Sequence, residues 1–217
     1  MSAPDLLVLV AFPPEIAPLA GRLPAGVVAA TCGVGLVEAA LGASRQLRMT
    51  GAKNVVFLGT CGAFEGAGLG VLDVVALART RLASAGVPEG LAALPEPMAR
   101  ELVADATLTA ALAPGAAAVT VASTLTLTVD DGAARALAHA TGAAAEHLEA
   151  FAVGLAAEQA GARFGAVLGV ANLVGSRGRE QWRAHHHEAS RRAAEALLEG
   201  LRGPWRLLLG GALPSKL

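Results

Sequence analysis

Two glutamates and an asparagine could surround a polar substrate: Glu15, Glu149 and Asn172. A carboxylate such as that of Glu149 can accept two hydroxyl groups at once through charge-assisted hydrogen bonds, and its charge favours a cationic transition state. A second carboxylate, that of Glu15, can orient and deprotonate a water molecule. The Asn172 amide offers a donor and an acceptor together, which suits the edge of a heterocyclic ring. Such a set of groups could carry out acid–base chemistry on a polar substrate.

Each of these three residues also fits an ordinary structural role. Glu15 and Glu149 both stand at expected helix starts, where the helix dipole favours acidic side chains. Asn172 can close an Asx turn, because its side chain readily bonds the nearby backbone. The residue types alone therefore leave both interpretations open.

Two further features could contact a flat ring. The small residues Thr60, Cys61 and Gly62 are expected to form a turn at a strand end, where the backbone can approach a ligand closely. Cys61 itself is interpreted as a buried small residue and not as a nucleophile. Trp182 can stack on a ring or cover a pocket, and it suits a core or interface position equally well.

The elements that must position these residues alternate between short β-rich runs and alanine-rich helical stretches. That alternation predicts an α/β fold in which helices cover both faces of a sheet. The expected strands are Leu6–Val10, Val27–Thr31, Asn54–Leu58 with a break at Gly59, Val71–Ala78, Ala118–Ser123 and Phe164–Val170. The expected helices are Gly35–Met49, one near Met98–Ala104, one capped by Asp130 and Asp131 and running to about His139, Glu149–Ala160 and Glu180–Leu201. Asn172 then follows the carboxyl end of a central strand, where open α/β sheets bind ligands.

Length, charge and cysteine content exclude several classes of protein. The 217 residues fit one large domain, residues 1–217, better than two small ones. A net charge of −1 without a basic stripe argues against nucleic acid or an acidic membrane surface as a partner. No apolar run approaches the roughly 18 residues of a membrane-spanning helix.

Cys32 and Cys61 form no CxxC pair, which favours reduced thiols and a cytoplasmic location. His185–His187 are consecutive and diverge on a helix, so we expect no metal and no other cofactor.

Four segments, taken in chain order, resemble the purine nucleoside phosphorylase and nucleosidase superfamily. They are Ala11–Leu19, Cys32–Ala40, Gly59–Phe64 with Gly70–Val75, and His147–Ala152 with Val170–Arg177, and Trp182 lies beyond the last. Within that superfamily the chain is most similar to futalosine hydrolases, through the Pro-x-Glu-Ile turn at residues 13–16 and the Ala-Asn-x-Val-x-x-Arg stretch at residues 171–177. The resemblance implies a single-domain three-layer α/β sandwich with a central mixed β-sheet.

The resemblance also implies a role for each site residue. Glu149 would accept the ribose 2′- and 3′-hydroxyls, and Asn172 would contact N7 and O6 of a 6-oxopurine such as hypoxanthine. Glu15 is the candidate activator of water. Glu149 and Asn172 should therefore face each other across one cavity. The residues expected to border the bound nucleoside are Thr60, Cys61, Gly62, Leu148 and Trp182.

The chain departs from its relatives at three positions. Pro13, His147 and Leu168 stand where relatives have a glutamate, an acid and an arginine. We interpret the acid and the arginine as a pair that was lost together, and His147 as a turn residue in preference to a pH-sensitive group. The arginine and the glycine-rich turn that grip phosphate in phosphorylases are also missing, which favours hydrolysis over phosphorolysis.

The predicted function is therefore hydrolysis of a purine nucleoside of the futalosine type, releasing hypoxanthine for menaquinone biosynthesis. Three alternatives stay open: a methylthioadenosine/S-adenosylhomocysteine nucleosidase, a purine nucleoside phosphorylase, and a non-catalytic nucleoside-binding protein. The group on the ribose 5′ carbon is not defined by the sequence. Since relatives commonly form dimers or larger rings, we also expect a homo-oligomer.

Overall fold

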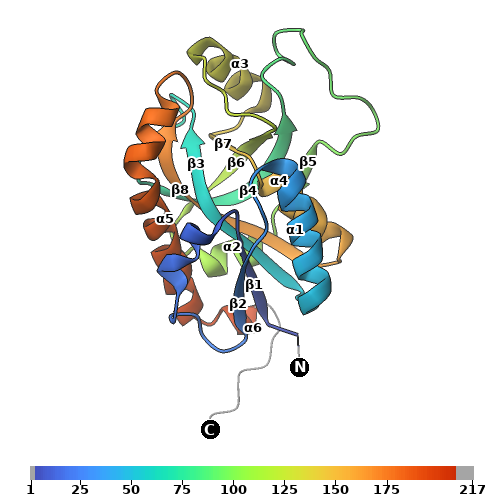
Figure 1. Ribbon diagram of the computed structural model, residues 1–217, viewed down its shortest axis with the longest axis vertical. Coiled ribbons are helices and arrows are strands. Elements are labelled where there is room, and N and C mark those ends of the chain that lie inside the picture. The colour runs from blue at the N-terminus through green and yellow to red at the C-terminus, as the bar shows by residue number, and fades with distance from the viewer. Residues whose placement is uncertain (1–2, 209–217) are drawn as a thin grey trace.

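The computed structural model describes residues 3–208, which build one eight-stranded mixed sheet with helices on both sides (Figure 1). The strands are β1 (Leu6–Val10), β2 (Val27–Thr31), β3 (Asn54–Ala63), β4 (Val74–Ala83), β5 (Glu101–Val103), β6 (Ala117–Thr124), β7 (Ala145–His147) and β8 (Arg163–Leu173). The helices are α1 (Gly35–Thr50), α2 (Ala106–Leu112), α3 (Asp131–Thr141), α4 (Ala150–Gln159), α5 (Gly178–Arg202) and α6 (Trp205–Leu208), with 3-10 turns η1 (Pro13–Glu15) and η2 (Ala17–Leu19). The predicted fold class is confirmed.

The sheet is partly closed on itself. Strand β3 pairs in parallel with β1 and β8, β8 pairs antiparallel with β4, and β4 pairs in parallel with β6. Strand β7 then links β6 back to β3. The strands β3, β8, β4, β6 and β7 therefore form a closed circuit, while β1 and β2 extend the sheet beyond it. This closure was not predicted from the sequence.

Strand β1 explains why both faces need helices. All five of its residues are buried, and they alternate between two core clusters. Leu7 and Leu9 belong to the cluster that contains the buried side of α1 and α4, and Leu6, Val8 and Val10 to the cluster that contains the buried side of α5. In Figure 1, α5 lies along one side of the sheet and α1 with α4 along the other. A strand buried on both faces reads as a continuous apolar run.

Two predictions about element boundaries are wrong in ways that affect the site. Strand β3 does not break at Gly59 but continues to Ala63, because β8 pairs with it over its full length. Thr60, Cys61 and Gly62 are therefore strand residues and not a turn. The register shifts between Cys61 and Gly62 because β8 carries one extra residue there, Ala171, and this bulge bends β8 at that point.

The predicted helix near Met98–Ala104 is also wrong. Residues 101–103 form the edge strand β5, antiparallel to β4, and Leu102 is buried between exposed neighbours. Arg79 and Arg81 of β4 hold Glu101 through ion pairs at 3.0 and 2.6 Å. The helix of this region, α2, begins later, after the Asp105 side chain has accepted the Leu108 amide. Strand β4 likewise begins at Val74 and not at residue 71.

Candidate active site

Glu15 is held at the carboxyl end of β1 by a short proline-led turn. Pro13 begins η1, where a proline fits because the first residues of a helix need no amide donor. The turn returns Glu15 toward the strand, and its Oε2 accepts a hydrogen bond of 2.9 Å from the amide of Ala11. The side chain is buried, with Glu15 5% exposed. Desolvation therefore raises the pKa of Glu15 to about 7, against the lowering effect of the Ala11 amide.

Glu149 lies buried at the start of α4, and both of its carboxylate oxygens have partners. Oε1 accepts a hydrogen bond of 2.7 Å from the amide of Gly35, the first residue of α1. Oε2 lies 3.3 Å from Nε2 of His147. Although Glu149 occupies the N-cap position of α4, its side chain makes no capping bond to that helix. The carboxylate is consequently directed away from its own helix, toward the loop that enters α1.

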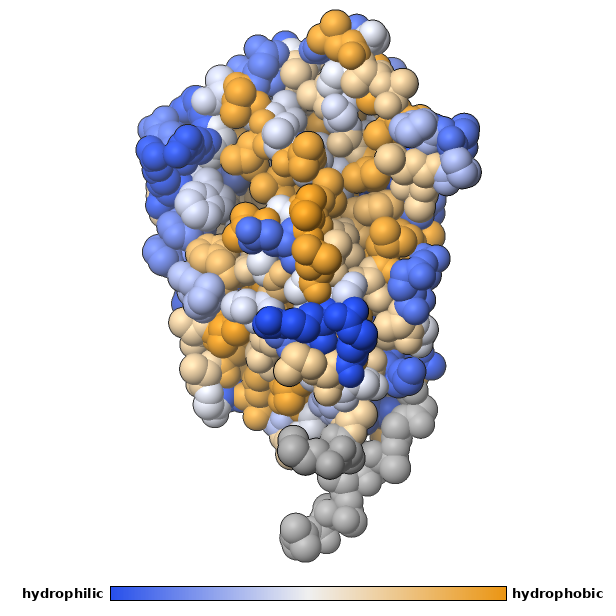
Figure 2. Space-filling view, turned by 45° about the vertical axis from the view of Figure 1, so that its right-hand side comes forward, coloured by the Kyte–Doolittle hydropathy of each residue, from blue (hydrophilic) through white to orange (hydrophobic). Residues whose placement is uncertain are grey.

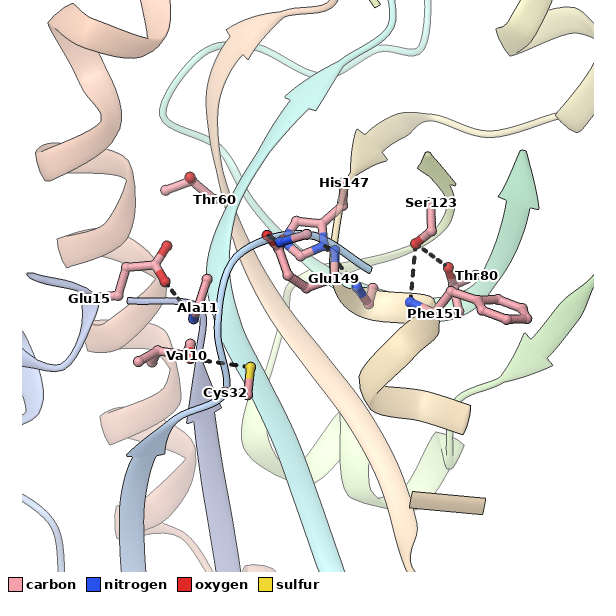
Figure 3. Close-up of polar contacts among 12 residues, drawn as sticks. Val10, Ala11, Glu15, Cys32, Thr60, Thr80, Ser123, His147, Glu149 and Phe151 are labelled. Carbon is pink, nitrogen blue, oxygen red and sulfur yellow. Dashed lines mark hydrogen bonds and ion pairs between the residues drawn. The ribbon is translucent and has the colours of Figure 1, made fainter. Parts of the chain in front are cut away.

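Other side chains satisfy the first amides of α4. Nδ1 of His147 accepts from the amides of Glu149 and Ala150, at 3.1 and 3.0 Å. Oγ of Ser123, on the neighbouring strand β6, accepts from the amide of Phe151 at 3.1 Å (Figure 3). A helix N-terminus leaves several amides without intrahelical partners. Because His147 and Ser123 take three of them, Glu149 is not needed as a cap.

Glu15 and Glu149 influence each other electrostatically. The charge of Glu149 is a further cause that raises the pKa of Glu15, after burial. Cys32, whose Sγ donates to the carbonyl of Val10 at 3.3 Å, also senses both carboxyls, and its pKa rises to about 12, mainly through burial. Figure 3 shows Glu15 to the left of β3 and Glu149 to the right, with Cys32 lower in the view and between them. Because its pKa is raised to about 7, the Glu15 carboxyl holds a proton in part of the molecules near neutral pH.

A cavity of about 220 Å³ opens beside Glu15. Its wall combines the apolar residues of η1 and η2 with a polar face of α5; the lining residues are Phe12, Pro14, Glu15, Ala17, Pro18, Thr60, Trp182, His186, His187, Ser190 and Arg191. Nε1 of Trp182 donates to Oγ1 of Thr60 at 3.4 Å, and the indole stacks on the ring of His186. The structure thus brings together Glu15, Thr60 and Trp182. A second cavity of about 300 Å³, near Arg81 and Thr141, contains none of the predicted site residues.

Asn172 lies on β8, on the other side of β3. Its Nδ2 donates to the carbonyl of Leu173 at 2.8 Å. It faces Gly62 across the bulge, and a Cβ on Gly62 would lie 2.8 Å from Nδ2, so this position accepts only glycine without displacing the amide. Gly62 also pairs with Glu146 of β7. Asn172 lies on β8 and Glu149 follows β7, the two strands that pair with β3 at Gly62, and their joint lining of one cavity stays a prediction.

The remaining predicted residues take different places. The side chain of Cys61 packs into the core, and burial raises its thiol pKa to about 12, which agrees with a buried small residue. Leu148 is half-buried between the buried His147 and Glu149. His147 is the last residue of β7 and not a turn residue, so that interpretation is wrong.

Several polar residues of this region were missed by the sequence analysis. Glu146 is buried and holds the segment after β6, because its carboxylate accepts from both Oγ1 and the amide of Thr128. Thr80 and Ser123 share a buried hydrogen bond of 2.9 Å beside α4. Three polar residues within four positions, Glu146, His147 and Glu149, indicate a polar end of the strand. The sequence does not show which partners these side chains contact.

Comparison with known proteins bears on the family and the fold. A sequence model described as the phosphorylase superfamily matches residues 8–202. Comparison with curated protein sequences gives no match. Among the described residues, 3–208, no helix has both the length and the apolar character that crossing a membrane requires.

Solved structures of nucleosidases share the fold. A 5′-methylthioadenosine/S-adenosylhomocysteine nucleosidase from Helicobacter pylori superposes with a TM-score of 0.81 at 14% identity, covering 93% of this chain and 99% of that one. The corresponding enzyme from Neisseria meningitidis gives 0.79 at 20% identity, with 91% and 98% covered. Native futalosine hydrolase of Helicobacter pylori gives 0.78 at 16% identity, with 92% and 97% covered. At these identities the similarity establishes the shared fold.

Proposed function

The chain belongs to the phosphorylase superfamily, and from that membership we propose that it is a nucleosidase that hydrolyses the N-glycosidic bond of a purine nucleoside. One observation carries the proposal. Two buried carboxyls, Glu15 and Glu149, lie within range of each other's charge, and the pKa of Glu15 is raised to about 7. A carboxyl with a pKa near neutral is suited to general base catalysis, because it is both available and basic enough to take a proton from water.

The proposed mechanism divides the chemistry between these two residues. Glu149 accepts the ribose hydroxyls with the lone pairs that Gly35 and His147 leave free, and its charge stabilises the oxocarbenium character of the transition state. Glu15, in its ionised form, removes a proton from the water that attacks the anomeric carbon. Asn172 donates to and accepts from the departing base.

The proposed substrate is a futalosine-type nucleoside with a 6-oxopurine base. An amide at position 172 presents a donor for N7 or O6, whereas a carboxylic acid there would protonate N7 directly. The proteins that share the fold include a methylthioadenosine/S-adenosylhomocysteine nucleosidase and a futalosine hydrolase. The fold alone therefore favours neither substrate. A methylthioadenosine/S-adenosylhomocysteine nucleosidase is accordingly the second candidate.

A substrate panel tests the proposal. The chain is incubated with futalosine, inosine, adenosine and methylthioadenosine, with and without phosphate, and free base and reducing sugar are measured. We expect hypoxanthine release from futalosine that does not depend on phosphate. Phosphate dependence would indicate a phosphorylase, and much faster adenine release would indicate the second candidate. Binding without release from any nucleoside would instead indicate a binding protein.

We also propose that the chain forms a homo-oligomer through the side that carries α1. Several large apolar side chains are exposed on and beside this helix, among them Val37 at 67%, Leu41 at 70% and Met49 at 73%. Figure 2, which turns this side forward, shows hydrophobic side chains gathered down the middle of the face. Apolar surface of this kind commonly marks a protein interface. Because Gly35 begins α1 and also contacts Glu149, an interface here would lie close to the proposed site.

A further inference from the structure

The side chain of His147 connects α4 to the carboxylate of Glu149. Its ring is buried, and both ring nitrogens are engaged: Nδ1 with the amides of Glu149 and Ala150, and Nε2 with Oε2 of Glu149. The ring of Phe57 packs edge-on against it, with ring centres 4.9 Å apart. The imidazole is therefore held by two backbone amides, one carboxylate and one aromatic ring, and Figure 3 shows it beside Glu149.

These contacts determine which nitrogen carries the hydrogen. Backbone amides only donate, so Nδ1 must offer its lone pair to Glu149 and Ala150. In a neutral imidazole the hydrogen then resides on Nε2, which points it at Oε2 of Glu149, 3.3 Å away. A hydrogen on Nδ1 would face the two amide hydrogens of Glu149 and Ala150, which is unfavourable. Burial also lowers the pKa of His147, although the charge of Glu149 acts in the opposite direction.

We propose that His147 is a positioning residue: as a neutral imidazole it donates from Nε2 to Glu149 and holds that carboxylate in the orientation that grips the ribose hydroxyls. The proposal rests on the nucleosidase function proposed above. The amide of Gly35 restrains the other oxygen, so the carboxylate is held at both ends. Such preorganisation matters because a long glutamate side chain otherwise loses rotamer freedom when it binds substrate.

A purely structural role, capping of α4, is the competing explanation, and two substitutions separate it from positioning. In His147→Asn the amide oxygen can take the place of Nδ1 and keep the cap, but nothing replaces Nε2–H. In His147→Gln the longer amide can place its NH₂ near Nε2 and keep the donor, but nothing replaces Nδ1. The exposed His139 of α3 offers a matched control, because His139→Asn makes the same chemical change away from the site.

The measurement compares ribonucleosides with 2′-deoxyribonucleosides. We expect kcat/KM for the ribonucleoside to fall about tenfold in His147→Asn, the effect of one hydrogen bond to a charged group, while the thermal midpoint stays near that of the wild type. The ratio of kcat/KM between the ribonucleoside and the 2′-deoxyribonucleoside should be smaller in the same variant, because a misplaced Glu149 binds the 2′-hydroxyl less strongly. His147→Gln should lower the thermal midpoint more and kcat/KM less, and His139→Asn should change neither.

Two results would overturn the proposal. One is wild-type kcat/KM in His147→Asn; the other is an unchanged 2′-hydroxyl effect in that variant, because a simple cap predicts both. If the wild type binds nucleosides without turnover, the same comparison is made on Kd by calorimetry. Absence of both turnover and binding refutes the proposed function instead.

A spectroscopic readout does not depend on activity. ¹⁵N NMR of the imidazole should show a neutral ring with hydrogen on Nε2, and Glu149→Gln should shift the Nε2 resonance while Glu199→Gln, at an exposed site on α5, should not. Hydrogen on Nδ1, or an Nε2 resonance that does not respond to position 149, would contradict the contact on which the positioning role depends.

Discussion

Replacing Glu15 with glutamine should abolish turnover and at the same time stabilise the fold. Burial raises the pKa of this carboxyl from its ordinary value of 4.5 to about 7, so the folded chain holds the proton more tightly than the unfolded chain does. Between those two pH values the folded state binds more protons, and its stability therefore falls as the pH rises. The free energy of unfolding lost by pH 8 amounts to about 3 kcal/mol.

Glutamine removes this penalty without removing the local contact. Its side-chain oxygen can still accept from the amide of Ala11, which now bonds Oε2 of Glu15. The expected gain in the free energy of unfolding is about 1 kcal/mol at pH 5 and about 3 kcal/mol at pH 8. Urea denaturation at the two pH values measures it, with Glu199→Gln on the exposed face of α5 as the matched control.

The catalytic counterpart of this prediction concerns pH. If ionised Glu15 is the base, kcat/KM of the wild type should rise about tenfold per pH unit below about 7 and level off above it. A variant that is no more stable than the wild type at pH 8 would show that the Glu15 proton is not held by burial. Such a result would refute the reasoning, whatever the variant does to activity.

Three further predictions concern other parts of the site and surface. Glu149→Ala should lower kcat/KM at least about 100-fold while circular dichroism shows a folded chain, because two charge-assisted hydrogen bonds to the ribose are lost; full activity would remove Glu149 from the site. Asn172→Asp should raise adenine release relative to hypoxanthine release in the substrate panel, since an acid at that position can protonate N7, and an unchanged ratio would contradict the base contact. Leu41→Arg, on the exposed apolar face of α1, should convert the oligomer to a smaller species by light scattering, whereas a wild-type monomer would contradict the proposed interface.

Most of the sheet was predictable because its longer strands consist of runs of consecutive apolar residues. Strands β1 and β2 lie where the apolar runs Leu6–Val10 and Val27–Thr31 predict them, and α3 begins at the acidic pair that caps it. The short strands β5 and β7 have no such signal, because three residues are too few to show a period. Glu101–Val103 becomes a strand only because β4 supplies both backbone pairing and two arginines.

The residue types of the site were predictable, but their partners were not. Proline-led Glu15 and the carboxylate of Glu149 could be recognised from their motifs, and Thr60 and Trp182 do lie beside Glu15. The role of His147 depends on which backbone amides reach Nδ1, and that depends on how the chain passes from β7 into α4. A sequence pattern does not show this geometry. Sequence reasoning therefore assigned His147 to a turn, although it is among the most buried polar residues of the site.

The resemblance to the superfamily implies that His147 and Leu168 replace an acid and an arginine, and the packing of the core relates these two positions. Leu168 is fully buried and lies opposite Gly59 in the β3–β8 register. The ring of Phe57 covers Gly59, since a Cβ there would lie 2.7 Å from it, and the same ring touches His147. The ring of Phe57 thus contacts His147 and also covers the strand position that pairs with Leu168. In relatives that carry an acid and an arginine at these positions, losing one partner alone would leave a buried charge unpaired, at a cost of about 3–5 kcal/mol.

Restoring the two charges singly and together tests that coupling. Leu168→Arg and His147→Glu should each lower the free energy of unfolding by about 3 kcal/mol or more, because each buries one unpaired charge. The double variant should be more stable than the sum of the two losses predicts, by at least about 1 kcal/mol, since the two opposite charges then attract each other. Strictly additive losses in urea denaturation would show that positions 147 and 168 are not coupled.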